Sequence, residues 1–220
     1  MTAYIFDTET TDSDPKTAQI VEAAWIRYKD LTSWHARFQP MAPIKLGALA
    51  THHITPEELV NCPPHTDFRL PADMEYMIGH NIDFDWQVAG SLPEIKRICT
   101  LAIARALLPD VDSHSQSALM YHFLGSAAKP KLVGAHSAAE DVKNCLELFS
   151  LLIGLSKRKF ATMEEIWQFS EECRLPTRMT FGKHKGEPIA SVPRSYAEWY
   201  ARQPDPDVYL IEAFKRARKL

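Results

Sequence analysis

The chain has few of the features that mark secreted, membrane or zinc-binding proteins. Its four cysteines, Cys62, Cys99, Cys145 and Cys173, show no Cys-x-x-Cys spacing, so we expect free thiols and no structural zinc site. No apolar run is long enough to cross a bilayer. The N-terminus lacks a basic flank followed by an apolar core and a cleavage site, so we expect no signal peptide and a cytoplasmic location.

The chain also lacks the basic excess that is typical of nucleic-acid-binding proteins. Its 220 residues carry a net charge of −3, but this charge is unevenly distributed. Residues 176–220 hold nine Lys/Arg and five Asp/Glu, a balance of +4, which leaves −7 for residues 1–175. The basic end would attract phosphate, whereas the acidic remainder would weaken non-specific binding unless metal ions offset its charge.

Length and composition predict one full domain and a small second one. With 45% hydrophobic and 24% charged residues, the chain can bury a sizeable core. We expect a main domain over residues 1–155, a helical linker over 156–175 and a small basic module over 176–220. A run of three basic residues at 157–159 marks the start of the linker.

The hydrophobic pattern predicts an α/β fold. Strands are expected at 4–7, 19–28, 34–39, 75–79 and 95–99. Helices are expected at 56–60, 83–89, 101–107, 115–124 and 138–153, and a capping box opens another at 162–165. This mixed order predicts a central mixed sheet flanked by helices, with the first three strands adjacent.

An acidic pair, Asp7 and Glu9, lies at the end of the first apolar run. Residues two apart on a strand point to the same face, roughly 7 Å apart along the chain. Like charges at this spacing favour a bound cation. A solvated strand end would also accommodate the pair, so the rest of the chain must decide between these interpretations.

Two further segments supply acidic residues at expected helix starts. Asp85 lies in the first turn of one helix, and Asp141 near the start of another. The apolar stripe of the second helix comprises Val142, Cys145, Leu146, Phe149, Leu152 and Ile153. The helix macrodipole alone favours acidic residues in first turns. It explains neither the register of Asp141 with the apolar stripe nor the presence of His136 five residues earlier.

Together these segments resemble the DEDDh 3′–5′ exonuclease family, which includes proofreading subunits of DNA polymerases, and within it the exodeoxyribonuclease X group. The matching motifs are Asp-x-Glu at Asp7 and Glu9, His-Asn-x-x-Phe-Asp at His80, Asn81, Phe84 and Asp85, and His-x-Ala-x-x-Asp at His136, Ala138 and Asp141. The stretch from Ala50 to Thr55 resembles the family's His-x-Ile-Thr segment. All of the motifs occur in the family's order and spacing.

The resemblance implies a ribonuclease H-like fold and a metal-dependent enzyme that shortens DNA to nucleoside 5′-monophosphates in repair or end processing. It implies that Asp7, Glu9, Asp85 and Asp141 hold two Mg²⁺ ions, with Asp7 bridging them, although Mn²⁺ would suit the same oxygen ligands. His136 is the implied general base, because an imidazole with an ordinary pKa near 6.5 can accept a proton at neutral pH.

The resemblance also implies contacts between the chain and nucleic acid. The implied residues in the main domain are Thr8, Thr10, His52, His80, Asn81 and Phe84. Local interpretations compete with this one. His80 and Asn81 are also typical turn residues that bind nearby backbone groups. His52 or His53 would equally fit a surface loop before the capping box at Thr55.

The basic module contains the stretch 179–186, in which glycines bracket a basic tip. The spacing predicts a hairpin that presents Lys183 and Lys185 on one side. Its Phe-Gly-Lys-x-x-Gly signature resembles the C-terminal module of the exodeoxyribonuclease X group. We expect Lys183 and Lys185, with nearby Arg178, to bind nucleic acid.

An aromatic stripe follows this stretch on a helix that begins near Ser195. Tyr196, Trp199 and Tyr200 share one face of this helix. Such a stripe more often forms the core of a small domain than a platform for stacked bases.

Asp12 departs from the family pattern, which often has Gly after Asp-x-Glu-Thr-Thr. Because Asp tolerates a positive φ less well than Gly and carries a negative charge, we expect it to alter the loop and to repel phosphate. Two other functions remain open: an RNA-trimming 3′–5′ exonuclease of the same family and a non-catalytic nucleic-acid-binding subunit. The presence of all four carboxylates and His136 argues against the non-catalytic subunit.

Overall fold

The computed structural model describes residues 2–179 and 181–220. It divides into two compact units, Met1–Ser170 and Glu171–Leu220, each with its own core. The limits expected from the sequence, 1–155 for the main domain, 156–175 for the linker and 176–220 for the basic module, remain predictions. The helix that follows the basic run contributes to the first unit, since the Ser170 hydroxyl accepts a hydrogen bond from the Cys99 backbone N–H at 2.9 Å.

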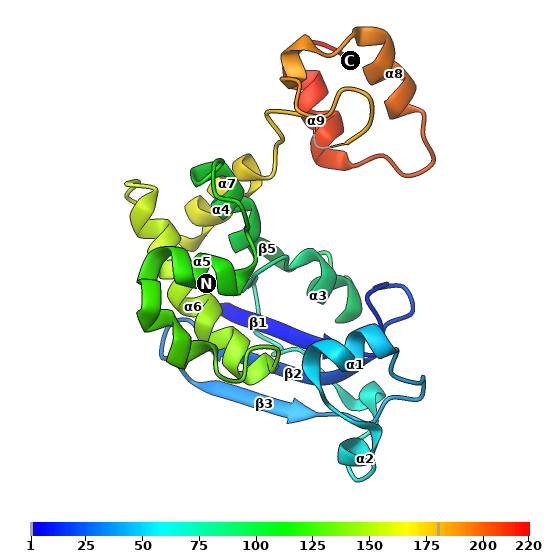
Figure 1. Cartoon of the computed structure of the whole chain (residues 1–220), viewed down its shortest axis with the longest axis vertical. Coiled ribbons are helices and arrows are strands. Elements are labelled where there is room, and N and C mark those ends of the chain that lie inside the picture. Colours follow the sequence, from blue (N-terminus) through cyan, green and yellow to red (C-terminus); the bar gives the residue numbers. More distant parts are fainter. Residues whose placement is uncertain (1, 180) are drawn as a thin grey trace. The chain divides into compact units, whose positions relative to one another are not determined.

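A five-stranded mixed sheet forms the centre of the first unit (Figure 1). Its strands, in the order β3-β2-β1-β4-β5, are β1 (Ala3–Thr10), β2 (Ile20–Arg27), β3 (Ser33–Arg37), β4 (Tyr76–Gly79) and β5 (Lys96–Cys99). The first three strands pair antiparallel, whereas β4 runs parallel to β1 and β5 runs parallel to β4. The predicted α/β architecture with a central mixed sheet is confirmed.

Helices surround this sheet. They are α1 (Leu46–His52), α2 (Pro56–Leu59), α3 (Asp83–Val88), α4 (Thr100–Leu107), α5 (Gln116–Leu124), α6 (Ala138–Leu155) and α7 (Met163–Cys173), with 3₁₀ turns η1 (His65–Asp67) and η2 (Gly125–Leu132). Among the described helices, none is long and apolar enough to span a membrane. Helix α1 was not predicted, because it contains Gly47, has no acidic residue in its first turn and has no side-chain N-cap.

The two faces of β1 have different roles. Tyr4 and Phe6 are fully buried in an aromatic cluster with Phe38 and Phe68. Because side chains alternate along a strand, Asp7 and Glu9 point to the opposite face. Helix α6 lies against β1 and β2 and brings Asp141 to this second face (Figure 1).

The second unit is built from η3 (Ile189–Ser191), α8 (Arg194–Ala201) and α9 (Val208–Arg216). The predicted aromatic stripe on α8 is divided between core and surface. Tyr196 and Tyr200 are buried, whereas Trp199 is 53% exposed. The prediction that the stripe belongs to the core is therefore correct for Tyr196 and Tyr200 and wrong for Trp199.

The described residues of the predicted hairpin, Met179 and 181–186, form a loop, and Thr180 lies outside the described residues. The backbone N–H of Gly186 donates to the Met179 carbonyl at 2.8 Å, and the N–H of Met179 donates to the Glu187 carbonyl at 2.9 Å. Beyond these bonds, Arg178 and Pro188 form an isolated antiparallel bridge, and the described residues of this segment form no strand. The two ends of the segment do run antiparallel, as predicted, but its described residues form no paired strands.

Gly79, the last residue of β4, allows a close approach to β1. A Cβ atom built there would lie 2.9 Å from the Phe6 carbonyl oxygen. We expect Gly79→Ala to lower the free energy of unfolding by about 1–3 kcal/mol, because the buried backbone of β1 must shift. Urea unfolding measures this change. Gly47→Ala on α1 is the matched control, since its Cβ would meet no atom within 4 Å, and an equal loss in both variants would contradict the expectation.

Candidate active site

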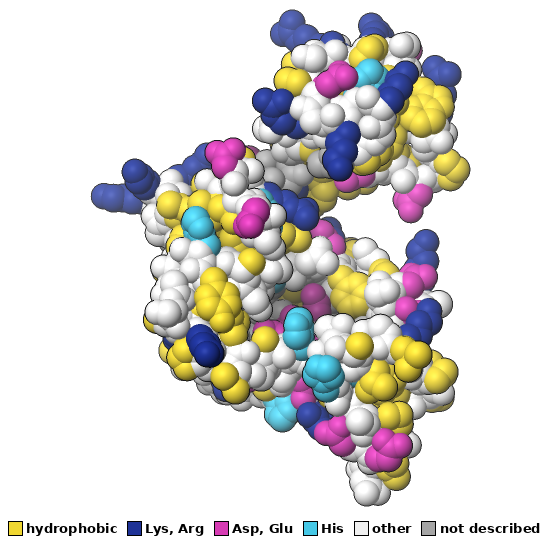
Figure 2. Space-filling model, in the orientation of Figure 1, with side chains coloured by type: hydrophobic (Ala, Val, Ile, Leu, Met, Phe, Trp, Pro, Cys, Tyr) yellow, Lys and Arg dark blue, Asp and Glu magenta, His cyan; other side chains and the backbone are white. Residues whose placement is uncertain are grey.

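Three carboxylates converge at the end of β1. Asp7 and Glu9 extend from β1 and Asp141 from the first turn of α6, and one oxygen of each lies within 4.8 Å of the other two. Asp7 and Glu9 accept no hydrogen bond from any residue that the structure describes. Figure 2 shows acidic side chains in a hollow on this unit, with histidines at its rim. Oxygen atoms without protein donors are the ligands that hard divalent cations prefer.

Asp85 adds a fourth carboxylate to this cluster. It lies on α3, is 5% exposed, and accepts hydrogen bonds from Thr8 through the backbone N–H at 3.0 Å and the hydroxyl at 2.7 Å. Both bonds reach the same oxygen, Oδ1. Thr8 thus fixes Asp85 beside β1 and leaves Oδ2 without a protein donor among the described residues.

Asp141 is held by two donors that come from other segments. The His136 backbone N–H donates to Oδ2 at 2.9 Å, and the Gln116 amide donates to Oδ1 at 3.1 Å. His136 is exposed and has a left-handed backbone with φ 69°. Its main chain therefore orients the carboxylate, while its imidazole makes no hydrogen bond to a described residue and stays accessible to solvent.

Each of the four carboxyl groups has a raised pKa in the absence of a cation. Burial, followed by neighbouring carboxylates, raises the pKa of Asp7 well above its ordinary range and that of Glu9 to about 9. Burial also raises the pKa of Asp85 to about 7, against the opposing hydrogen bonds from Thr8, and raises that of Asp141. A bound cation would remove this electrostatic conflict.

Glu22 is a further acidic residue at this site that the sequence analysis missed. It pairs with Glu9 across β1 and β2 and is only 1% exposed. Its carboxylate accepts hydrogen bonds from the Ala138 backbone N–H at 2.8 Å and the Ser137 hydroxyl at 3.2 Å, both at the start of α6. Arg37 on β3 compensates the charge at 3.1 Å. These two hydrogen bonds hold the segment between His136 and Asp141 against the sheet.

Three of the residues predicted to bind nucleic acid have their polar side-chain atoms engaged inside the protein. Thr8 binds Asp85, and the Thr10 hydroxyl donates to the Asp12 carbonyl at 2.7 Å. His52 Nδ1 accepts from the Ile54 N–H at 3.0 Å, so Nε2 carries the proton and donates to the Thr10 carbonyl at 3.2 Å. These side chains support the end of β1 and offer no unused donor there.

His80 is also occupied internally. Its Nε2 donates to the His114 carbonyl at 2.9 Å, and its Nδ1 accepts from the Thr100 hydroxyl at 2.9 Å. Burial lowers the pKa of His80 to about 4, so its ring is neutral at pH 7. The next residue, Asn81, lies in a turn, since it has φ 64° and its backbone carbonyl accepts from the Phe84 N–H.

The other predicted contacts remain accessible. Asn81 is exposed and Phe84 is half-buried, both at the start of α3 close to Asp85. Lys183 and Lys185 are exposed in the second unit.

Asp12 neither strains its loop nor leaves an unmatched negative charge, in contrast to the prediction. Its backbone does not have a positive φ, and its buried carboxylate pairs with Lys45 and accepts from the Thr17 hydroxyl at 2.8 Å. The hydrogen bond from Lys45, followed by that from Thr17, lowers the pKa of Asp12 to about 2. The expected repulsion of phosphate is offset, because the negative charge is matched by Lys45.

The raised pKa of Glu9 predicts how stability varies with pH. The folded state keeps a proton up to about pH 9, whereas the unfolded state releases it near the ordinary pKa of 4.5. The free energy of unfolding of the metal-free protein should therefore fall as the pH rises from about 5 to about 9. Urea unfolding in EDTA across this range measures the effect.

The same series in Glu9→Gln should have a shallower slope, and added Mg²⁺ should restore the stability of the wild type at high pH. Glu94→Gln, an exposed site, is the control and should follow the wild type. A slope that Glu9→Gln leaves unchanged would contradict the assignment of this effect to Glu9.

Comparison with known proteins places this geometry in a family. A family model described as Exonuclease matches residues 4–149, well over half of the chain. A second model, described as a putative quorum-sensing-regulated virulence factor, matches residues 174–217. The two matches fall on the first and second units respectively.

Curated relatives support the same grouping. Exodeoxyribonuclease 10 of Escherichia coli (strain K12) is 28% identical over 200 residues, which cover 89% of this chain and 88% of the relative. DNA polymerase III subunit epsilon of Treponema pallidum (strain Nichols) is 28% identical over 166 residues, covering 67% of this chain and 74% of that protein.

Solved structures share the fold. Exonuclease X in complex with 5′ overhanging duplex DNA matches with a TM-score of 0.57 and 26% identity, covering 75% of this chain and 99% of that chain. Escherichia coli exonuclease I in complex with a dA16 oligonucleotide matches with a TM-score of 0.56 and 18% identity, covering 80% of this chain and 44% of that chain. The predicted ribonuclease H-like fold and the DEDDh resemblance are confirmed. The chain therefore belongs to the exonuclease family, and it is an enzyme of the 3′–5′ exonuclease type.

Proposed function

We propose that this enzyme hydrolyses DNA from the 3′ end and releases nucleoside 5′-monophosphates, in DNA repair or end processing in the cytoplasm. In this proposal Asp7, Glu9, Asp85 and Asp141 hold two divalent ions, Mg²⁺ by preference. The observation that carries it is the cluster of three carboxylates within 4.8 Å, two of which have no protein donor among the described residues. The exodeoxyribonuclease and exonuclease X relatives support DNA as the substrate.

The carboxylates fit such ions by chemistry and by charge. They supply only oxygen ligands, and no cysteine joins the cluster among the described residues. Divalent ions held there would neutralise charge on the phosphate, lower the pKa of a water molecule and stabilise the leaving 3′ oxygen. The raised pKa values of Glu9 and Asp85 mean that the cluster needs positive charge to be fully ionised at neutral pH.

His136 is the proposed general base. Its imidazole is exposed, while its backbone N–H is bound to Asp141 and its left-handed φ fixes the loop before α6. A ring nitrogen of the neutral form can accept the proton of the attacking water. Asn81 and Phe84, which stay accessible beside Asp85, are the proposed contacts for the terminal nucleotide.

Product analysis with 5′-labelled single-stranded DNA and matched RNA tests the proposal. We expect a ladder that shortens from the 3′ end of DNA with Mg²⁺ and stops in EDTA. Asp7→Ala should abolish cleavage, since it removes an unpartnered ligand from the cluster. His136→Ala should lower kcat by about 10²- to 10⁴-fold, the usual contribution of a general base.

Asp110→Ala and His122→Ala are matched controls, because both side chains are exposed and lie outside the carboxylate cluster. They should retain wild-type rates. Shortening of RNA alone would replace DNA by RNA as the substrate. Binding of DNA without cleavage in any divalent metal would leave a non-catalytic binding subunit as the function.

Glu22 should affect the reaction through the start of α6. Glu22→Gln removes the charge that binds the Ala138 N–H and Arg37, so we expect kcat to fall by about 10- to 100-fold, as for other residues that orient metal ligands. The apparent affinity for Mg²⁺, measured by titration of activity, should fall as well. Glu58→Gln is a matched control, since Glu58 binds the same Arg37 from an exposed position at 2.8 Å. Equal losses in both variants would show that Glu22 acts only through Arg37.

A further inference from the structure

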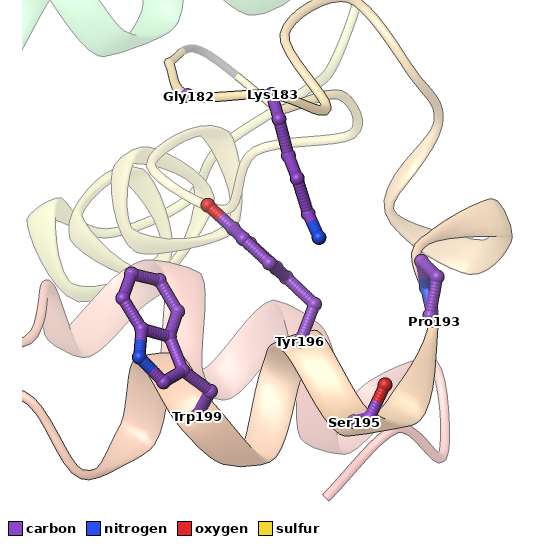
Figure 3. A pocket seen from close by; sticks show the side chains of 6 residues that line it. All are labelled: Gly182, Lys183, Pro193, Ser195, Tyr196 and Trp199. Carbon is purple, nitrogen blue, oxygen red and sulfur yellow. The ribbon is translucent and has the colours of Figure 1, made fainter.

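The second unit contains a pocket that the proposed hydrolysis does not use. Its volume is about 500 Å³, and it is lined by Gly182, Lys183, Pro193, Ser195, Tyr196 and Trp199 (Figure 3). Pockets that bind small ligands typically measure about 300–1,000 Å³. The pocket is thus large enough to receive a flat group such as a nucleobase.

One wall of the pocket is aromatic. Tyr196 is buried, and its ring centroid lies 5.2 Å from that of Trp199, which is 53% exposed. Nearby, Phe181 is 41% exposed and its ring lies 5.7 Å from that of Tyr200. Large aromatic side chains left this accessible on a small unit are typical of binding surfaces.

The opposite side of the pocket carries positive charge. Lys183 extends from the loop toward the space between Tyr196 and Pro193, and its Nζ lies 5.4 Å from the Tyr196 ring centroid (Figure 3). Among the described residues it forms no ion pair. Ser195, in the first turn of α8, adds an exposed hydroxyl at the positive end of the helix.

The Phe-Gly-Lys-x-x-Gly signature has a structural reason at this pocket. Gly182 has φ 71°, and a Cβ built there would lie 2.9 Å from the Tyr196 hydroxyl. Gly186, which closes the loop, has φ 85°. The glycines let the loop pass close over Tyr196, which places Lys183 beside the aromatic wall.

We propose that this pocket binds single-stranded DNA, with a base stacked on Trp199 and a phosphate held by Lys183 and Ser195. Single strands expose the faces of their bases, and proteins bind them by combining aromatic stacking with a positively charged groove. The balance of +4 over residues 176–220 complements the charge of the strand. The inference rests on the proposed function only in taking DNA as the substrate.

A second binding site on the same chain has a consequence for long substrates. Once a strand is bound at one site, its binding at the other becomes intramolecular, and the overall affinity rises without new contacts. Strands long enough to engage both sites should therefore bind more tightly than short ones, and this gain should depend on Trp199.

Fluorescence anisotropy of the full chain with a 5′-labelled 30-nucleotide strand, in EDTA to prevent cleavage, tests the proposal. We expect Trp199→Ala to raise Kd about tenfold, as loss of one stacked base does, and Trp199→Phe to restore most of the affinity. Lys183→Ala should raise Kd and reduce the slope of log Kd against log salt by about 0.7, the value for one phosphate contact on a single strand.

Val208→Ala and Lys215→Ala are the matched controls, because both residues are exposed on α9 and neither lines the pocket. Val208→Ala should bind like the wild type, and Lys215→Ala should lose much less affinity than Lys183→Ala. Unchanged affinity in Trp199→Ala and Lys183→Ala would overturn the proposal, as would an equal loss of affinity for a blunt duplex, which offers no free base faces.

Hydrolysis of the p-nitrophenyl ester of thymidine 5′-monophosphate separates this inference from the proposed function. This substrate has no strand to reach the second unit, so Trp199→Ala should cleave it at the wild-type rate while binding the long strand weakly. No hydrolysis by the wild type would count against the proposed function alone. Loss of hydrolysis in Trp199→Ala would count against a separate binding site.

Discussion

Repulsion among the clustered carboxylates is the constraint on which the rest of the first unit depends. Asp7 and Glu9 come from one strand, and the fold brings Asp85 and Asp141 to them from two separate helices. In the metal-free protein, burial and mutual repulsion make the charged forms of these groups unfavourable, so the fold is stable only where they keep protons or bind a cation. The sheet and helices must therefore supply enough stability elsewhere to keep the carboxylates together.

The surrounding contacts fix some carboxylates firmly and leave others free. Thr8 binds Asp85, and Gln116 with the His136 main chain binds Asp141. Neither Asp7 nor Glu9 has a donor among the described residues. This division suits a metal centre, because two ligands are held rigidly by the protein while the central pair keeps its oxygen atoms for the ions.

Local sequence patterns predicted the strands, most helices and the acidic residues, since these depend on alternation, helical spacing and order along the chain. They did not reveal Glu22 or Gln116, because a single acidic or amide residue in a strand or helix gives no periodic signal and acquires its partners only through long-range packing. The exposure of Trp199 could not be predicted from the sequence either. Its spacing matches that of Tyr196 and Tyr200, and only the tertiary packing of α8 against α9 distinguishes them.

The pairing of Asp12 with Lys45 also changes how a substitution in this loop would act. Asp12 and Lys45 together contribute no net charge near the end of β1, and the Lys45 N–H additionally binds the Thr11 carbonyl. Asp12→Gly in this chain would not simply remove a negative group. It would also leave the exposed ammonium of Lys45 without its carboxylate partner, so the loop after β1 would gain an unpaired cation that can attract phosphate. The residue at position 12 thus sets the charge of its neighbour as well as its own.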